Sequence, residues 1–515
     1  MNPDSTRTPA AALVVLLVLC ASACAVPLAP GYRILKQSRE VAFVPGNPPE
    51  LHVRELYTVE NSGTADLPFV DANFPVERSY GRANIRVEID GQEAAPAILP
   101  ADEQQARPEA LRIPFDAVWK RGQKRQLSIE YTLRSPEDSG SRTTIGENSF
   151  HLASRGWYPE LLPPKRVLSP YPNAPKFSAF TVRVPPDFLV LARGVPKGAK
   201  KAADGTEYRY NLDSSTMATY VVAGKYSAWP AQRRPSSTVF WTMQPMKDDP
   251  SAGARQIDSI WNEIGKDFGP LDKNIAFPRI VESPELRRRF SDDEAPAAVA
   301  FPGGALVNPA ALALGAGSDE FLNIVSRALA RGWFGESMLL SDAAAVGMGE
   351  GLPGYAGIVI EEARHGPEAR RKRVTEYLRR YDEASKGAAE TPLSAVMIGD
   401  AVGPRRIALA KAPLFFIALE DVCGEEPMRK GLTRLLATQR GREAGYADLR
   451  SALEESCSRN FAPMFRLWLN SKGIPPDFRQ RYQGGAVGEV AEIFDRSTFR
   501  LISLRRQRER NYLDR

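Results

Sequence analysis

Histidine is rare in this sequence, which has only His52, His151 and His365 among its 515 residues. Any histidine-ligated metal site would have to draw on these three positions. The count alone does not exclude such a site. The places where the three histidines fall decide whether one can form.

Cysteine is also scarce, with four residues in the chain. Once Cys20 and Cys24 are assigned to an N-terminal leader, only Cys423 and Cys457 remain. A single pair excludes a zinc knuckle, which needs a second pair of ligands. In an oxidising compartment the pair could form a disulfide that closes a loop of about 34 residues and stabilises the fold by about 3 kcal/mol. Two buried, unpaired thiols are the alternative that the sequence leaves open.

The chain also lacks a strong charge of either sign and an internal repeat. Its 68 lysine and arginine residues and 62 acidic residues leave a formal net charge of +6, which is too weak to indicate a nucleic-acid partner. The absence of a repeating period argues against a solenoid. With 25% charged and 43% hydrophobic residues, the composition is typical of a globular protein, and the length predicts roughly three domains.

The sequence begins with a segment that is typical of an export signal, over residues 1–25. Arg7 precedes an uncharged run at 10–19, and small residues at 21–23 lead into Cys24. This ending resembles a bacterial lipoprotein box with a lipidated cysteine, although ordinary cleavage is also allowed. We therefore expect an exported protein, either periplasmic or lipid-anchored to a bacterial envelope membrane through Cys24. An uncleaved anchor helix is disfavoured, because the apolar run is shorter than the roughly 20 residues of a membrane span.

Residues 30–245 alternate in the manner of β-strands. Apolar side chains at 127, 129, 131 and 133 point to one face, and polar residues and turn signals separate several such runs. The pattern predicts an N-terminal, all-β domain of sandwich type.

The apolar period changes near residue 250. Residues 257, 260, 261, 264 and 268 place one apolar stripe on a helix that ends at a Gly-Pro step. Ser318 can cap a second helix, from 319 to about 334. We expect a mixed domain at 250–395 and a helical part at 396–485. The basic tail at 486–515 is either a solvated extension or a segment attracted to anionic lipid.

Several short strings in both halves resemble strings in the membrane alanine aminopeptidase family. The members of this family are thermolysin-like gluzincin zinc metallopeptidases. The strings are Trp-Tyr-Pro at 157–159, Ala-Gly-Lys-Tyr at 223–226, Phe-Gly-Pro at 268–270, Arg-Ile-Val-Glu at 279–282 and Gly-Trp-Phe-Gly at 332–335. The last string is similar to the end of the family's zinc helix. The resemblance implies a multidomain β plus α/β fold, in which an antiparallel β-sandwich precedes a thermolysin-like, mixed but mainly helical peptidase-type domain at 250–395.

The same resemblance implies that the catalytic metal site is degenerate. The family's H-E-x-x-H motif supplies two zinc ligands and a general base, and the aligned positions here hold Arg327, Ala328 and Arg331. Glu350 keeps the place of the third ligand, at the family's spacing. Ala300 aligns with a glutamate that would hold a peptide's amino terminus, and Leu409 with a transition-state tyrosine.

These substitutions predict a protein that binds rather than cleaves, with no cofactor. A lone glutamate does not hold zinc against two guanidinium groups. The structural interpretation is an ion pair of Glu350 with Arg331, with or without Arg327; the functional interpretation is that one arginine binds an anion in the former cleft. The expected partner is a peptide or an envelope protein.

Two other functions stay open. The first is an active metallo-aminopeptidase whose zinc site uses Glu350, Glu361 and His365, since the last two residues lie one helical turn apart. A surface ion pair between Glu361 and His365 is the simpler interpretation of that spacing. The second is a structural subunit of an envelope complex that uses neither cleft nor metal.

Overall fold

The computed structural model describes most of the chain between residues 31 and 483. The described residues are 31–74, 82–98, 111–135, 143–153, 157–162, 177–202, 204–212, 219–230, 237–246, 248–269, 271, 277–289, 297–397, 401–440 and 443–483. The predicted leader at 1–25, with Cys24, and the basic tail at 486–515 lie outside them.

The chain packs into two compact units, each of which is described by itself. The β unit is formed by Met1–Glu137, Gly156–Pro186 and Gly194–Met217. The helical unit is formed by Asp138–Arg155, Asp187–Arg193 and Ala218–Arg515. Short pieces of the first half of the sequence therefore pack with the second half, so no single point in the chain separates the two units.

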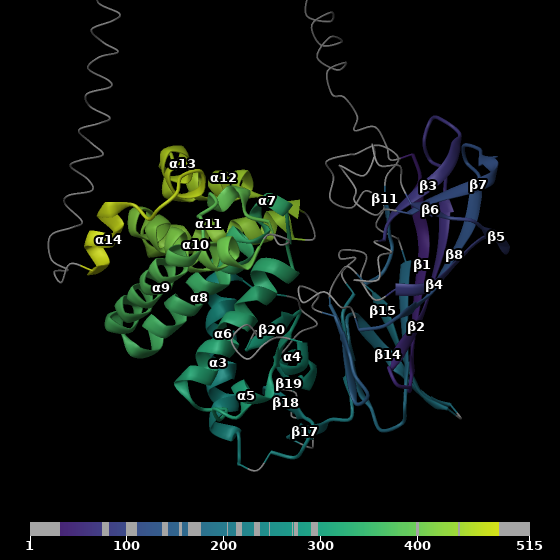
Figure 1. The fold of residues 1–515 in the computed structure, drawn as a ribbon, viewed down its shortest axis with the longest axis horizontal. Coiled ribbons are helices and arrows are strands. Elements are labelled where there is room, and N and C mark those ends of the chain that lie inside the picture. Colours follow the sequence, from purple (N-terminus) through teal and green to yellow (C-terminus); the bar gives the residue numbers. More distant parts are fainter. Residues whose placement is uncertain are drawn as a thin grey trace, which may run out of the picture. The chain divides into compact units, whose positions relative to one another are not determined.

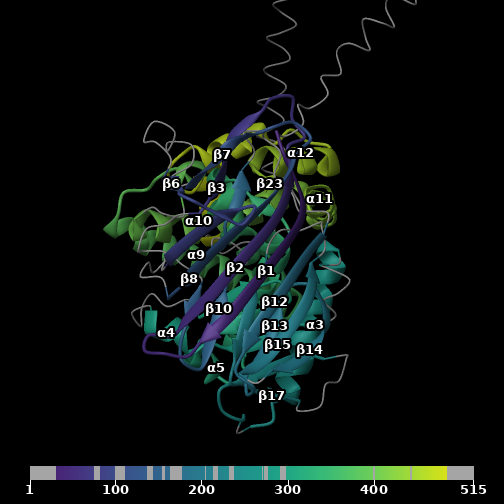
Figure 2. The same ribbon diagram turned by 90° about the vertical axis from the view of Figure 1, so that its right-hand side faces the viewer.

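An eight-stranded sheet dominates the β unit, in the order β14-β15-β12-β1-β2-β8-β4-β5. Its strands are β1 Arg33–Val44, β2 Glu50–Glu60, β4 Arg82–Ile89, β5 Gln92–Ala94, β8 Lys124–Leu133, β12 Phe177–Val184, β14 Val195–Ala202 and β15 Gly205–Leu212. Neighbouring strands are antiparallel except β1 and β12, which are parallel. Figure 2 shows β1, β2, β8 and β12 side by side in this sheet.

The alternation in the sequence corresponds to the burial in this sheet. The apolar side chains at 127, 129, 131 and 133 of β8 are all buried, as expected for the inward face of a strand. A second sheet, β11-β3-β7-β6, completes the β unit. Its strands are β3 Leu67–Asn73, β6 Ala97–Ile98, β7 Leu111–Trp119 and β11 Glu160–Leu162.

Three further sheets belong to the helical unit, in the orders β13-β16-β10-β9, β17-β18-β19-β21-β20 and β22-β23. Their strands are β9 Thr144–Ile145, β10 Ser149–Leu152, β13 Leu189–Ala192, β16 Val221–Gly224, β17 Ser227–Trp229, β18 Val239–Thr242, β19 Arg279–Glu282, β20 Ala298–Phe301, β21 Gly304–Val307, β22 Leu339–Leu340 and β23 Glu443–Ala444. In the five-stranded sheet, β18, β19 and β21 are parallel, and β17 and β20 are antiparallel edge strands.

Helices form the rest of this unit. They are α3 Ser251–Phe268, α4 Pro284–Arg289, α5 Pro309–Leu312, α6 Asp319–Arg331, the π-helical turn η2 Gly332–Glu336, α7 Asp342–Ala345, α8 Gly347–His365, α9 Pro367–Gly387, the 3₁₀ turn η3 Leu393–Ala395, α10 Val402–Cys423, α11 Glu425–Gln439, α12 Tyr446–Cys457, α13 Ala462–Leu469 and α14 Pro476–Gln483. The predicted apolar stripe on α3 is buried. Helices α8, α9 and α10 pack against one another (Figure 1).

The chain from Ala343 to His365, which contains α8, is long and apolar enough to cross a membrane, but most of it is buried inside the helical unit. Burial of this kind is typical of a core helix, whose apolar surface is covered by its neighbours.

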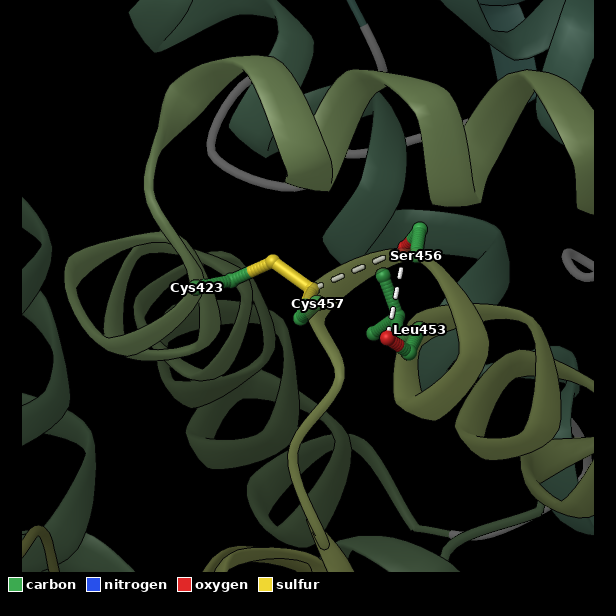
Figure 3. Close-up of a disulfide and its surroundings, with 4 residues drawn as sticks. All are labelled: Cys423, Leu453, Ser456 and Cys457. Atoms are coloured by element: carbon green, nitrogen blue, oxygen red, sulfur yellow. Dashed lines mark hydrogen bonds between the residues drawn. A yellow bond between two sulfur atoms is a disulfide. The ribbon is translucent and has the colours of Figure 1, made fainter.

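A disulfide joins the last residue of α10 to the last residue of α12. Cys423 and Cys457 have Cα atoms 5.4 Å apart, a usual separation for a disulfide, and Figure 3 shows the bonded sulfur atoms beside Ser456. Of the two interpretations of the cysteine pair, the structure adopts the cross-link. It ties together the ends of α10 and α12, the helices that precede and follow α11 in the sequence.

Candidate functional site

Helix α6 carries the two arginines of the candidate site, and its start is well defined. Ser318 has an extended backbone, and its hydroxyl accepts a hydrogen bond from the Phe321 N–H at 3.2 Å. Asp319 and Glu320 lie in the first turn, where negative charge is favourable beside the positive end of the helix dipole. The predicted cap is therefore present, and it marks the start of α6.

The end of α6 is held by the Gly-Trp-Phe-Gly string, which forms the π-helical turn η2. The Trp333 indole N–H donates to the Gly269 carbonyl at 2.8 Å, and its ring packs edge-on to Trp261 at a centroid distance of 4.7 Å. Phe334 packs in the same way against Phe268, at 4.9 Å. This aromatic cluster joins the end of α6 to α3, so the last turn of α6, with Arg331, has a fixed position.

Helix α8 lies close to α6 and α10 because glycines stand at its contact points. An ideal Cβ at Gly357 would lie 2.8 Å from Cγ of Arg327, and one at Gly351 would lie 3.0 Å from the Ala412 carbonyl oxygen. Real Cβ atoms do not approach that closely. These glycines therefore let α8 pack closely against α10 and against the Arg327 side chain of α6.

Arg331 and Glu350 form an ion pair between α6 and α8. Arg331 Nη1 donates to Glu350 Oε1, and the two side chains are 17% and 28% exposed. An ideal Cβ at Gly335 would lie 3.3 Å from Arg331 Cγ, so a larger residue there would crowd the arginine. The Nε of Arg331 is buried without a hydrogen-bond partner, which leaves donor capacity in the site.

Arg327 lies one helical turn before Arg331, and its side chain is half-buried. Its Nε is buried and unpartnered, and within the described residues no hydrogen bond or ion pair engages its guanidinium group. Ala328, the aligned position of the general base, is buried in the helical core. Among the described residues the candidate site therefore has one paired and one unpaired arginine, and a methyl group stands at the position that the resemblance assigns to a general base.

The other two positions that the resemblance assigns to catalytic residues hold apolar side chains. Ala300 is buried on β20, against which α6 packs. Leu409 is exposed on α10. Neither position offers a polar group that could hold a peptide amino terminus or stabilise a transition state.

The side chains at the aligned zinc positions do not fit zinc. Guanidinium groups stay protonated and have no lone pair for a metal, and the one carboxylate, on Glu350, accepts a hydrogen bond from Arg331. Over the part of the chain that the structure describes, no group of three His, Cys, Asp or Glu side chains gathers.

The alternative metal set of Glu350, Glu361 and His365 is not brought together. Glu361 accepts two hydrogen bonds from Arg373, at 2.8 and 2.6 Å, and His365 Nε2 lies 3.5 Å from Asp319 Oδ1. Glu350 and Glu361 are separated by about 16 Å along α8, since each helical residue rises about 1.5 Å. The surface pair expected between Glu361 and His365 is also replaced by these other contacts.

One polar network that was not predicted from the sequence surrounds Lys411 on α10. Its buried Nζ donates to Glu390 Oε1 and to the Ser471 carbonyl, both at 2.8 Å. Burial lowers the pKa of Lys411, although Glu390 opposes the shift. The sequence feature that could have indicated this network is Lys411 itself, which lies inside an otherwise apolar run at 407–419. A lysine buried in such a run needs a polar partner. The network holds α10 to the loops around Glu390 and Ser471.

Comparison with known proteins places this geometry in a known fold. No family model matches the sequence, and no curated protein matches it. An M1 zinc metallopeptidase from Deinococcus radiodurans is similar in structure, with 14% identity, a TM-score of 0.60, and coverage of 87% of this chain and 96% of that one. A variant of an M1 zinc metallopeptidase from the same organism, bound to a Tyr-Ser-Ala substrate, is 15% identical. Its TM-score is 0.61, and the match covers 87% of this chain and 96% of that one.

Native yeast LTA4 hydrolase is also similar, with 12% identity and a TM-score of 0.62 over 87% of this chain and 69% of that one. At these identities the likeness concerns the fold alone. It confirms the fold class predicted from the sequence, a β-rich N-terminal domain followed by a mainly helical peptidase-type domain. The chain has the fold of the M1 zinc metallopeptidases.

Proposed function

We propose that this protein is an exported, catalytically inactive relative of the zinc aminopeptidases that binds a peptide or an envelope protein. The proposal is supported by the fold, which it shares with an M1 zinc metallopeptidase whose structure holds a Tyr-Ser-Ala substrate. The observation that carries it is the ion pair between Arg331 and Glu350, at two positions that the resemblance assigns to zinc ligands.

The ion pair opposes hydrolysis for a physical reason. A zinc peptidase needs a metal-bound water and a carboxylate that takes its proton. Glu350 is already engaged by Arg331, and a divalent cation at this place would meet the positive charges of Arg331 and Arg327. Ala328 has no group that accepts a proton. We therefore expect no metal-dependent cleavage and no cofactor.

Metal analysis and a reversal of the degenerate motif test the proposal together. Protein purified without chelator should contain far less than one zinc per chain and should not hydrolyse aminoacyl substrates. The triple variant Arg327→His, Ala328→Glu and Arg331→His should gain about one zinc per chain, because Glu350 would then complete the ligand set. The same triple variant with Glu350→Ala is the matched control and should lose the gained zinc.

The opposite result is equally clear. Stoichiometric zinc in the unmodified protein, together with aminoacyl hydrolysis that Glu350→Ala abolishes, would overturn the proposal in favour of an active metallo-aminopeptidase. Such a result would require metal ligands beyond the side chains that surround Arg331.

The proposal includes a place in the bacterial envelope. The support is the leader-like sequence before Cys24 and the disulfide between Cys423 and Cys457, since disulfides persist in oxidising compartments. Membrane association would come from a lipid on Cys24 or from the basic tail. Fractionation of cells that express the full chain tests this: Cys24→Ala should release the protein from membranes if the lipid holds it, and a chain ending at 485 should do so if the tail holds it.

A further inference from the structure

Helices α6 and α8 run antiparallel, and their charged side chains meet in cross-helix contacts along the seam between them. At the start of α6, Asp319 Oδ1 lies 3.5 Å from His365 Nε2 and 3.7 Å from Arg364 Nη2, both at the end of α8. At the end of α6, Arg331 pairs with Glu350 near the start of α8. The two ends of the seam thus each place an acid against a base.

The middle of the seam lacks this complementarity. Arg327 of α6 lies against Gly357 of α8, whose ideal Cβ would lie 2.8 Å from Arg327 Cγ. The nearest acid along α8, Glu361, is held by Arg373 through two hydrogen bonds. Within the described residues Arg327 therefore has no acidic partner, although its Nε is buried.

An unpaired guanidinium in this setting favours an anion. Among the side chains that the structure describes at this part of the seam, two guanidinium groups, on Arg327 and Arg331, stand with one carboxylate, that of Glu350, so one positive charge is left over among them. A partly buried charge without a partner is unfavourable, and a planar guanidinium fork matches a carboxylate with two parallel hydrogen bonds. The buried Nε of Arg331 is a second unpartnered donor beside it.

We propose that Arg327 binds a carboxylate of the ligand, either the C-terminal carboxylate of a peptide or the side chain of an acidic residue. This inference rests on the proposed function, because it assumes that the ligand reaches this part of the helical unit. Glu350 holds Arg331 in place and leaves Arg327 as the free cation. Selectivity then comes from the ligand's negative charge.

Three fluorescein-labelled octapeptides of one alanine–serine sequence test the inference. The first ends in a free carboxylate, the second in a carboxamide, and the third in a carboxamide with one central glutamate. Fluorescence anisotropy with the full chain should show about tenfold tighter binding of the first or the third than of the second, as expected for one charge-assisted contact. The peptide that binds more tightly identifies the source of the carboxylate.

Two variants assign the preference to Arg327. Arg327→Gln should abolish it, and Arg327→Lys should retain part of it, because the charge remains and the fork is lost. Arg364→Gln, which removes the same charge at the other end of the seam, is the matched control and should leave the preference unchanged. Circular dichroism spectra of all variants establish that they are folded.

The failures of the two proposals can be told apart. Equal binding of all three peptides, or a preference that survives Arg327→Gln, overturns the carboxylate inference and leaves the proposed binding function standing. Binding of none of the three also overturns the inference. Stoichiometric zinc with aminoacyl hydrolysis overturns the proposed function itself.

Discussion

Two arginine–carboxylate pairs, one in each unit, use the same chemistry in different settings. In the β unit, Arg39 and Glu55 face each other across β1 and β2 and are 2% and 0% exposed. In the helical unit, Arg331 and Glu350 join α6 to α8 and are 17% and 28% exposed. The first pair is removed from water, whereas the second remains within reach of it.

The surroundings of the two pairs differ as much as their exposure. Arg39 Cζ lies 3.6 Å from the ring centroid of Tyr158 and 5.0 Å from that of Trp157, within range of cation–π attraction. Gln37 Nε2 donates to Glu55 at 3.2 Å, and the pair has no buried polar atom without a partner among those described. Because residues of the β unit satisfy the polar atoms of Arg39 and Glu55, this pair contributes to the packing of the unit. The incomplete site at Arg331 has donors left for a ligand.

Removal of Glu55 should have the largest effect on stability. Glu55→Ala leaves Arg39 charged and buried, and breaking a buried pair in this way costs about 3–5 kcal/mol. Urea unfolding of the intact protein, followed by near-ultraviolet circular dichroism, measures the loss and reports the aromatic rings beside Arg39.

The double variant Arg39→Met with Glu55→Leu is the control for that experiment. Replacing both charges by apolar groups of similar volume should cost much less than the single change, because no charge is left unpaired. A loss below about 1 kcal/mol in Glu55→Ala would mean that Arg39 reaches water without its partner, and would break the contrast with Arg331.

A third cluster, around Arg370, is less buried than the pair at Arg39 and more buried than the pair at Arg331. Its stability should depend on pH, which adds a second test of the comparison. Arg370 and Glu420 are 13% and 8% exposed, with their charged atoms 2.9 Å apart. Burial raises the pKa of Glu420 above its ordinary value of 4.5, although Arg370 opposes the shift. A raised folded-state pKa contributes stability that is complete below the unfolded pKa and is lost as the pH rises through the folded pKa.

At acid pH, Glu420→Gln should cost about 2 kcal/mol, because the protonated carboxyl beside the charged Arg370 is replaced by an amide. This cost should shrink as the pH rises above about 4.5, because the unfolded chain then releases a proton that the buried Glu420 still holds in the folded protein. Denaturant unfolding of both proteins at several pH values measures the difference. Burial raises the pKa of Asp421 too, so the variant keeps part of the pH dependence. A cost that grows with pH would contradict the predicted sign.

Local patterns in the sequence predicted much of the fold and part of the site. Alternation over 127–133 predicted a buried strand face, and the apolar stripe at 257–268 predicted α3, because both depend on neighbours within one element. The cap at Ser318 has the same local origin. The resemblance assigned both Arg331 and Glu350 to zinc-ligand positions, and so predicted that these two residues lie close together. The structure shows them paired, Arg331 on α6 and Glu350 on α8.

Contacts that depend on packing between elements could not be predicted in this way. Arg39 and Glu55 meet because β1 and β2 pair in one register, which depends on the geometry of the turn between the strands and on which face of each strand is buried. Glu361 was expected beside His365, but α9 brings Arg373 to it instead. Long-range packing thus decides which of these charges are paired, and among the described residues it leaves Arg327 without an acidic partner.

The ion pair of Arg331 with Glu350 should contribute less to the free energy of unfolding than the more buried pairs of Arg39 with Glu55 and of Arg370 with Glu420. A double-mutant cycle with Arg331→Ala and Glu350→Ala should give a coupling energy of about 1 kcal/mol. Glu350→Ala should destabilise the protein more than Arg331→Ala, because it leaves two arginines together without an acid. Thermal or urea unfolding measures both effects; simple additivity would count against the ion pair.

The smallest effect is expected at the exposed pair of Arg54 and Glu130, whose side chains are 46% and 44% exposed and lie 2.9 Å apart. A double-mutant cycle should give about 0.5 kcal/mol at low salt, and almost nothing in 1 M salt, where the screening length falls to about 3 Å. The coupling of Arg331 with Glu350 should fall less with salt, because its charges are less exposed. If both pairs lose their coupling equally, exposure does not separate them, and the distinction between a charge reserved for packing and one available to a ligand loses its physical basis.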